Sequence, residues 1–327
     1  MPPSNSASAE RQRSPDLLSA SVIIPTRDRP EDLRKCVQSL VEQTQLPEEI
    51  IVVDDGTLEP EPLIRMANAA GVRFLYIPKE GPPGQARSRN IGVARSTGDI
   101  IFFFDDDVVL ESDYLEATLR LYQADPEGKV GGIGGVIVND PHIGPARALA
   151  ELLRGTPSWG HGKIFACGFN QLNYHAVRRV QPVQWLGGGV SSFRRTVLDE
   201  FRFAEHYQDY TLFEDAEHSY RVSQKFQLLI TPEARLYHYP SPIRWYDPEG
   251  YASKQITNLG YHFRRNMPQR LYNKLAFGWY IVAMLVTDIV RLVFMPHRIG
   301  SNWARLKGHL RGIRQHLSSS LPPSEGA

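Results

Sequence analysis

Short apolar runs alternate with helix-like patterns over the first third of the chain. In each run the apolar residues are consecutive rather than alternate, and the runs are Ser21–Ile24, Glu49–Val53, Val72–Ile77 and Ile100–Phe104. Between them, the spacing predicts a helix that begins at Pro30 and another over residues 84–95. Strands that are apolar throughout are buried on both faces. The pattern therefore predicts an α/β fold in which helices cover both sides of a mostly parallel sheet.

The remaining two thirds of the chain are less regular. Residues 139–182 have a mixed composition with few periodic signals. A helix is predicted from Phe213 to about Lys225, and strands are predicted near Phe226–Ile230 and Arg235–His238. No internal repeat is present in the sequence.

Polar residues follow three of the predicted strands. They are Thr26-Arg27, Asp54-Asp55 and Asp105-Asp106-Asp107. In open parallel sheets, ligands bind beyond the carboxyl ends of the strands. We therefore expect these three strand ends to meet in one crevice.

The three consecutive aspartates require something that neutralises their charge. Two like charges about 4 Å apart repel by roughly 4 kcal/mol at an effective dielectric constant near 20. Asp105 and Asp107 lie on the same side of an extended chain, and hard oxygen ligands suit Mg²⁺ or Mn²⁺. The sequence predicts a divalent cation site here. The alternative is a solvated acidic turn.

Two further segments allow two interpretations each. Asp54-Asp55-Gly56 is either a turn or a carboxylate site for a nucleobase or a ribose. Residues 81–92 join a Gly/Pro loop to a helix start that contains Arg87 and Arg89, and helix N-termini attract phosphate. The alternative there is a solvated basic helix. The P-loop pattern is absent.

The composition is that of a globular protein with an uneven charge distribution. Hydrophobic residues make up 42% of the 327 residues, which excludes a wholly disordered chain. Two cysteines are too few for a disulfide framework, and they lack the spacing of a zinc site. Residues 1–250 contain 26 basic and 34 acidic residues, whereas residues 251–327 contain 11 basic and 2 acidic ones. This asymmetry indicates two surfaces with different partners.

An apolar run marks the basic C-terminal part. Residues 275–287 are uncharged and almost wholly apolar, and Asp288 and Arg291 follow before a second apolar run that ends at Met295. A spanning helix needs about 20 apolar residues, and a central charge costs about 2.5–3.5 kcal/mol. We predict a helix that lies in or dips into the cytoplasmic leaflet, with its basic flanks on anionic lipid. The alternatives are a soluble core helix or dimer interface, and a true span.

Six segments together resemble a known family. They are Ser21–Thr26, Val52–Gly56, Arg89–Gly92, Phe104–Asp107, Gly187–Gly189 and Glu214-Asp215. Their order and spacing resemble those of family-2 glycosyltransferases with the GT-A fold, over residues 21–239. The resemblance implies a three-layer α/β/α catalytic domain that uses a nucleotide sugar.

The resemblance also implies a role for each matched residue. The nucleotide pocket would contain Pro25, Thr26, Arg27, Asp54 and Asp55, with Arg89 near the diphosphate and Asp106 and Gly188 beside the donor. Asp105 and Asp107 match the D-x-D pair that binds Mg²⁺ or Mn²⁺, and His238 stands where several such enzymes supply a third ligand. Asp215, next to Glu214, matches the general base of inverting members. At a helix start, the helix dipole is expected to favour its ionised form.

These matches predict an enzyme that transfers one sugar, with inversion, to a glycan or lipid-linked acceptor. The Q-x-x-R-W motif of processive members is absent, because Ser241 stands three positions before Arg244. A UDP-sugar is the expected donor. The expected location is cytoplasmic, peripheral at the inner face of the plasma membrane. No nucleic-acid partner is expected, because no binding motif is recognised.

Two other functions stay open at this stage. One is a nucleotidyltransferase of related fold, although its Gly-rich loop is not evident around Pro25–Arg29. The other is a non-catalytic nucleotide-sugar-binding scaffold, against which the complete set of Asp105, Asp107 and Asp215 argues.

The predicted division of the chain has four parts. Residues 1–19 form a disordered tail, residues 20–245 a GT-A-like catalytic domain, residues 246–316 a basic and apolar helical extension, and residues 317–327 a flexible tail.

Overall fold

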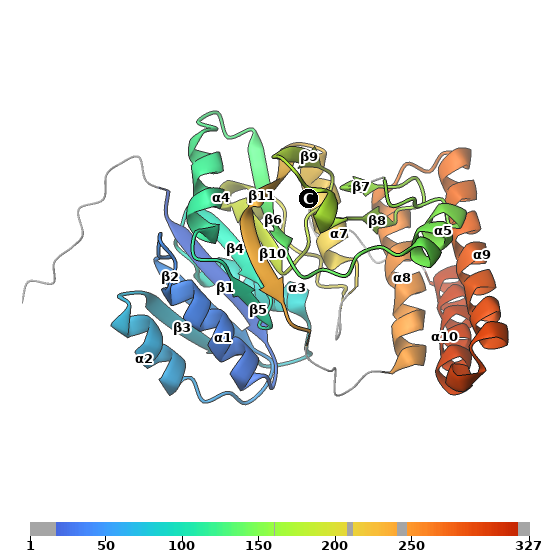
Figure 1. Ribbon diagram of the computed structural model, residues 1–327, viewed down its shortest axis with the longest axis horizontal. Helices are drawn as coiled ribbons and strands as arrows, with labels where there is room; N and C mark the ends of the chain where they lie inside the picture. Colours follow the sequence, from blue (N-terminus) through green and yellow to red (C-terminus); the bar gives the residue numbers. More distant parts are fainter. Residues whose placement is uncertain (1–17, 160, 208–211, 241–246, 320–327) are drawn as a thin grey trace, which may run out of the picture.

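The structure is a computed structural model that describes residues 18–159, 161–207, 212–240 and 247–319. The predicted boundary between residues 245 and 246, most of the N-terminal tail and most of the C-terminal tail lie outside these residues. The described part consists of a mixed sheet covered by helices on both faces and a C-terminal layer of three long helices (Figure 1).

The first third of the chain forms the parallel half of the sheet. Its strands are β1 (Ala20–Thr26), β2 (Glu49–Asp54), β3 (Arg73–Pro78) and β4 (Ile100–Phe104). They stand in the order β3-β2-β1-β4, and each neighbouring pair is parallel. The connecting helices are α1 (Pro30–Val41), α2 (Glu61–Ala69) and α3 (Gln85–Arg95). The alternation read from the apolar runs is confirmed.

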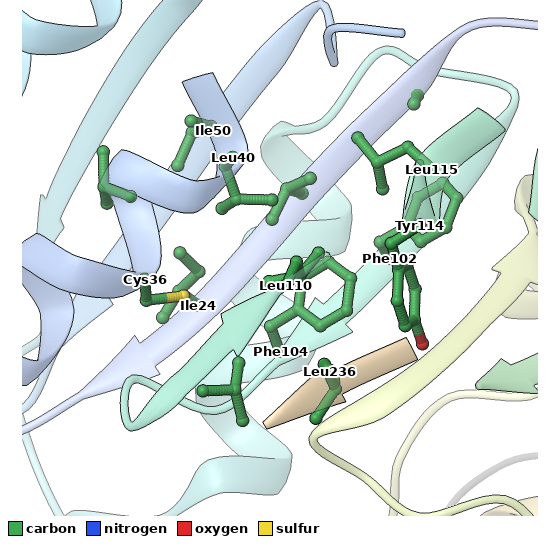
Figure 2. Packing of buried hydrophobic residues seen from close by; sticks show 14 of the residues in the cluster. Ile24, Cys36, Leu40, Ile50, Phe102, Phe104, Leu110, Tyr114, Leu115 and Leu236 are labelled. Atoms are coloured by element: carbon green, nitrogen blue, oxygen red, sulfur yellow. The ribbon is translucent and has the colours of Figure 1, made fainter. Parts of the chain in front are cut away.

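Successive residues of these strands contribute to two different cores. Val22, Ile24, Phe102 and Phe104 pack in a cluster with α1 and α4 (Tyr114–Gln123), as Figure 2 shows for part of this core. Their neighbours Ile23, Ile101 and Phe103 pack in a second cluster on the opposite face, with residues of α3, α6 (Arg195–Glu200) and α7 (Glu214–Ser223). Burial on both faces explains why β1, β2 and β4 contain runs of consecutive apolar residues.

The second half of the sheet is mixed. β10 (Val190–Arg194) runs antiparallel between β4 and β6 (Val130–Ile137), and β11 (Gln227–His238) follows β6 in parallel. The short strands β5 (Val108–Leu110) and β9 (Gln181–Val183) both pair antiparallel with β11. The two strands predicted after residue 225 are one strand, because β11 continues through an irregularity between Ile230 and Arg235 and keeps its pairing with β6.

Residues 139–182, which gave few signals, form small elements. They are α5 (Pro145–Leu153), β7 (Lys163–Ile164), β8 (Asn170–Gln171) and the 3₁₀ helix η1 (Tyr174–Ala176), followed by the first two residues of β9. Apart from α5, these elements have only two or three residues each, which is too short to produce a periodic pattern.

Three helices follow the sheet region at the C-terminal side. They are α8 (Pro248–Asn266), α9 (Leu271–Phe294) and α10 (Ile299–Ser318), with the short 3₁₀ helix η2 (Pro296–Arg298) between the last two. In Figure 1 they stand side by side at one end of the molecule, while α1 and α2 lie at the other. Asp247 caps α8 by accepting hydrogen bonds from the backbone N–H groups of Glu249 and Gly250.

Candidate active site

The polar ends of the parallel strands lie at one edge of the sheet. Thr26 and Asp54 are register partners at the ends of β1 and β2, and Asp105 follows β4, the other neighbour of β1. Pro25 is buried inside β1, and Arg27 is exposed beyond its end. The predicted convergence of these strand ends is confirmed.

The two aspartates after β2 have different partners. Asp54 is buried and accepts hydrogen bonds from the N–H groups of Gly56 (2.7 Å) and Leu58 (2.9 Å) and from the hydroxyl of Tyr76 (3.0 Å). These bonds support the turn interpretation for Asp54. Asp55 is half-buried and pairs with Lys79, whose Nζ lies 2.7 Å from Oδ1. A role in nucleotide binding stays a prediction for both.

The aspartates after β4 diverge at a turn. Ligand atoms of Asp105, Asp107 and His238 all lie within 4.8 Å of one another. The Nε2 atom of His238 is 3.1 Å from Oδ1 of Asp107, and this neighbour raises the pKa of His238. His238 is brought here because the end of β11 pairs with β5, directly after the aspartates. Distant segments of the sequence therefore meet at one point.

Asp106 points to different partners. Its carboxylate accepts a hydrogen bond from the hydroxyl of Thr26 at 2.7 Å and lies 3.1 Å from Nη1 of Arg29. Burial raises the pKa of Asp106 to about 6, although both partners favour its charged form. Asp106 thus ties the turn after β4 to the end of β1.

The group of Asp105, Asp107 and His238 fits a divalent cation. Oδ1 of Asp105 is buried and has no hydrogen-bond partner among the described residues. Burial and the charge of Asp107 raise the pKa of Asp105, so a cation would stabilise its ionised form. A side chain at Gly189 would collide with this carboxylate, since a Cβ atom there would lie 2.1 Å from Oδ2. Two carboxylates and an imidazole are ligand types that Mn²⁺ accepts.

Arg89 connects this group to α7. Its side chain is only 1% exposed. Nη1 lies 3.0 Å from Oε1 of Glu214, and Nη2 lies 3.7 Å from Oδ1 of Asp105. The guanidinium also lies over the ring of Phe203, and a Cβ at Gly188 would collide with it. Arg89 therefore holds two acidic groups at a fixed separation.

Asp215 lies in the first turn of α7. Its Oδ2 accepts a hydrogen bond from the N–H of Gly188 at 3.1 Å, and its Oδ1 accepts one from the N–H of Ala216 at 2.7 Å. Burial and the neighbouring Glu214 outweigh these donors and raise the pKa of Asp215 to about 7. The contribution expected from the helix start stays a prediction, and the net pKa is raised because desolvation is the largest effect.

The residue before this pair has an unusual backbone. Phe213 has φ 73°, in the left-handed region that non-glycine residues seldom occupy. Such a conformation persists only where the surrounding structure fixes it, and it is common at functional sites. The turn directs Glu214 toward Arg89 and Asp215 toward Gly188.

The sequence did not identify three residues that support the site. Arg29 bridges Asp106 and Asp107 with contacts of 3.1 Å each. Lys79 donates to Asp55 and to the carbonyl of Gly84, which precedes α3. Asn139 exchanges two hydrogen bonds with the backbone of His238, at 2.7 and 2.9 Å. The position of Lys79 directly after the third strand is the signal that could have found it.

Comparison with known proteins assigns the N-terminal half to a family. Residues 21–180 match the family model described as "Glycosyl transferase family 2". These residues belong to glycosyl transferase family 2. The resemblance read from the six segments is confirmed, and the family favours a glycosyltransferase over a nucleotidyltransferase.

Two curated relatives match parts of the chain. The chain is 34% identical over 109 residues to glycosyltransferase GlyA of Streptococcus pneumoniae, which covers 32% of the chain and 16% of that protein. It is 24% identical over 256 residues to the O-antigen biosynthesis protein RfbC of Myxococcus xanthus, which covers 74% of the chain and 19% of that protein. The chain therefore spans a small part of the length of these relatives.

The structural comparison shows the GT-A fold for the chain. The mannosyltransferase PcManGT from Pyrobaculum calidifontis, in complex with GDP-Man and Mn²⁺, superposes with a TM-score of 0.55 at 15% identity. The alignment covers 92% of this chain and 88% of that one. The predicted α/β fold class, including a C-terminal helical region, is confirmed.

Proposed function

We propose that this protein transfers a single sugar from a nucleotide-diphosphate sugar to an acceptor hydroxyl with inversion. The observation that carries the proposal is the convergence of Asp105, Asp107 and His238 within 4.8 Å. They meet at the carboxyl edge of the parallel strands, where open α/β sheets bind their ligands. Family membership and the GT-A fold support glycosyl transfer.

The donor would lie along the carboxyl edge of β1, β2 and β4. Thr26 and Asp54 end adjacent strands there, and Asp55 is held by Lys79 next to the start of α3. The binding of GDP-Man by PcManGT supports a nucleotide-sugar donor in general. We retain a UDP-sugar as the specific donor of the proposal, with Pro25, Arg27, Asp106 and Gly188 lining the same site.

Asp105, Asp107 and His238 would hold Mg²⁺ or Mn²⁺. When bound there, the cation supplies Lewis-acid stabilisation of the charge that develops on the diphosphate leaving group. Arg89 keeps Asp105 in place through its contacts with Asp105 and Glu214. Its positive charge also lies where negative charge increases during the reaction.

Asp215 would act as the general base, with Glu214 and Arg89 fixing its position. A pKa of about 7 is well matched to accepting a proton from an acceptor hydroxyl near neutral pH. The N–H of Gly188 orients one carboxylate oxygen and the N–H of Ala216 orients the other. This arrangement argues against a non-catalytic scaffold, in which nothing would require a half-buried carboxylate with such a pKa.

We extend the proposal to location and acceptor. The enzyme would be peripheral at the inner face of the plasma membrane, and its acceptor would be a glycan or a lipid-linked glycan. The basic, apolar C-terminal region and the similarity to RfbC, an O-antigen biosynthesis protein, support this part.

The test is turnover of a panel of UDP- and GDP-sugars with Mn²⁺, comparing the wild type with Asp215→Asn. The amide cannot accept the proton, so we expect turnover to fall by roughly 10²–10⁴-fold while donor affinity is retained. Asp199→Asn is the matched control, because Asp199 is exposed on α6. Wild-type turnover in Asp215→Asn would exclude Asp215 as the base, and no turnover of any donor by the wild type would overturn the proposed function.

A further inference from the structure

Helix α9 exposes one apolar face to solvent. Only 17% of its most apolar 18-residue window is buried, and its mean hydropathy there is 1.7. The exposed side chains recur at helical spacing, and they are Leu271, Tyr272, Leu275, Trp279, Val282, Val286, Ile289, Val290, Val293 and Phe294. A contiguous exposed apolar surface of this kind marks an interaction site in a soluble domain.

The opposite face of α9 packs against α8 and α10. Tyr280 and Met284 pack against Ile256 and Leu259 of α8. Asp288 is 1% exposed and pairs with His309 and, at 3.6 Å, with Arg305 of α10. A transmembrane orientation would place this charged contact and two polar helices in the hydrocarbon core, which is strongly unfavourable. Although α9 is long enough to cross a bilayer, we infer that it does not span one.

Helix α5 extends the exposed face of α9. Leu149, Leu152 and Leu153 are exposed on α5. The indole N–H of Trp279 donates to the carbonyl of Leu153 at 2.8 Å, and Arg154 donates to the hydroxyl of Thr287 at 3.2 Å. These bonds join two segments that are distant in the sequence, and α5 and α9 lie at the same end of the molecule in Figure 1. We call their combined exposed surface the α5–α9 face.

Cations surround this face, and no exposed carboxylate lies on its helices. Arg270 and Lys274 stand at the start of α9, Arg298 follows its end, and Lys307 lies on the neighbouring helix α10. All four are exposed and have no ion pair to any described residue. The only acidic residues of α5, α9 and α10 are Glu151 and Asp288, and both are buried. The charge around the α5–α9 face is therefore complementary to an anionic surface.

We propose that the α5–α9 face binds the surface of an anionic membrane, with α9 parallel to the bilayer plane. The apolar side chains would enter the boundary between headgroups and acyl chains, and the flanking cations would contact anionic headgroups. A second copy of the chain is a poorer occupant, because a two-fold interface would bring each cationic rim against an identical rim without carboxylates to pair with it.

The position of the α5–α9 face also indicates where the acceptor comes from. This inference rests on the proposed function. The backbone of His238 is held by Asn139, and residues 139–144 lead directly from Asn139 into α5. A membrane bound to α5 therefore lies at the end of a short loop that begins beside the proposed metal ligands. We infer that the acceptor is a lipid whose headgroup hydroxyl or glycan reaches the site from the membrane surface.

Flotation of the full chain with vesicles tests the membrane-binding face. Wild-type protein should float with phosphatidylcholine vesicles that contain phosphatidylglycerol and bind about tenfold or more weakly to phosphatidylcholine alone. The Val286→Glu/Val293→Glu variant places two charges on the exposed face of α9, and we expect its binding to fall by about tenfold or more. Leu149→Glu/Leu152→Glu should weaken binding in the same direction.

The matched control is Asn68→Glu/Ala69→Glu, which adds two charges at exposed positions of α2, at the far end of the molecule. It should bind vesicles like the wild type. Absence of flotation by the wild type would overturn the proposal. So would a dimer that the α9 variant dissociates without any change in flotation.

Flotation needs no catalysis, and donor hydrolysis needs no membrane, so the two proposals fail separately. Retained hydrolysis and folding in the α9 variant, together with lost flotation, would support the membrane face. Flotation by a wild-type protein that turns over no donor would leave the surface standing and remove both the proposed function and the lipid acceptor.

Discussion

The sheet region and the C-terminal helices use apolar residues in opposite ways. Phe103 in β4 is fully buried and packs against Phe193 and Phe203. Val286 and Val293 in α9 are 52% and 64% exposed. An apolar run in the sequence therefore stabilises the fold in one region and presents a binding surface in the other. Whether an apolar segment becomes part of the core or an exposed surface depends on whether neighbouring elements cover it, and not on its composition.

The two regions also treat buried charge differently. At the sheet edge, carboxylates of Asp105 and Asp215 have raised pKa values because burial is not fully compensated. Among the C-terminal helices, Asp288 is enclosed by His309 and Arg305 of the neighbouring helix. A carboxylate whose desolvation is not fully compensated by the protein is expected where a ligand or a proton binds to it. A carboxylate that is paired within the protein instead holds neighbouring helices together.

The largest contrast is expected between equivalent truncations in the two regions. Phe103→Ala removes a ring from the core and should lower the free energy of unfolding by about 3–5 kcal/mol. Val286→Ala on the exposed face of α9 should change it by no more than about 0.5 kcal/mol. Urea denaturation of both variants measures this difference. Equal destabilisation would mean that the α5–α9 face is covered by protein.

A smaller loss is expected on removing the buried charge of the C-terminal helices. Asp288→Ala leaves His309 and Arg305 without their carboxylate, and we expect a loss of about 1–3 kcal/mol in the free energy of unfolding. Glu127→Ala, which breaks the exposed pair with Lys129, is the control and should cost less than about 1 kcal/mol. If Asp288→Ala is as stable as the wild type, this contact does not hold α9 to α10.

The smallest expected effect is on the pH dependence of catalysis. Asp215 acts as a base only when ionised, so activity should be lost as the pH falls through its pKa of about 7. For a single group of that pKa, kcat/KM should drop about tenfold between pH 8 and pH 6. The residual activity of Asp215→Asn should lack this acid limb. If the variant shows the same loss of activity at low pH, that loss belongs to a group other than Asp215.

The parallel half of the fold could be predicted because β1, β2 and β4 are buried on both faces and therefore contain consecutive apolar residues. The pairing of β5 with β11, which brings His238 to Asp107, could not be read from periodicity, because β5 has three residues. Resemblance alone suggested that contact. Residues that meet only through tertiary structure, such as Arg29 with Asp106, left no local signal.

The C-terminal region shows the same limit. The apolar run of α9 was evident in the sequence, but its exposed face and its junction with α5 were not. Leu149, Leu152 and Leu153 resemble the buried face of a short core helix until the structure shows them exposed. The partner of Asp288 is 21 residues away, on another helix, so sequence spacing within α9 could not identify it.

The most direct test of the proposed site is calorimetry of a UDP- and GDP-sugar panel with the wild type and Asp107→Asn, in Mn²⁺ and in EDTA. We expect one donor to bind the wild type in Mn²⁺, and binding to weaken by at least about tenfold in EDTA or in the variant, because Asp107 would be a metal ligand. Equal donor affinity in Mn²⁺ and EDTA would contradict a cation held by Asp105, Asp107 and His238.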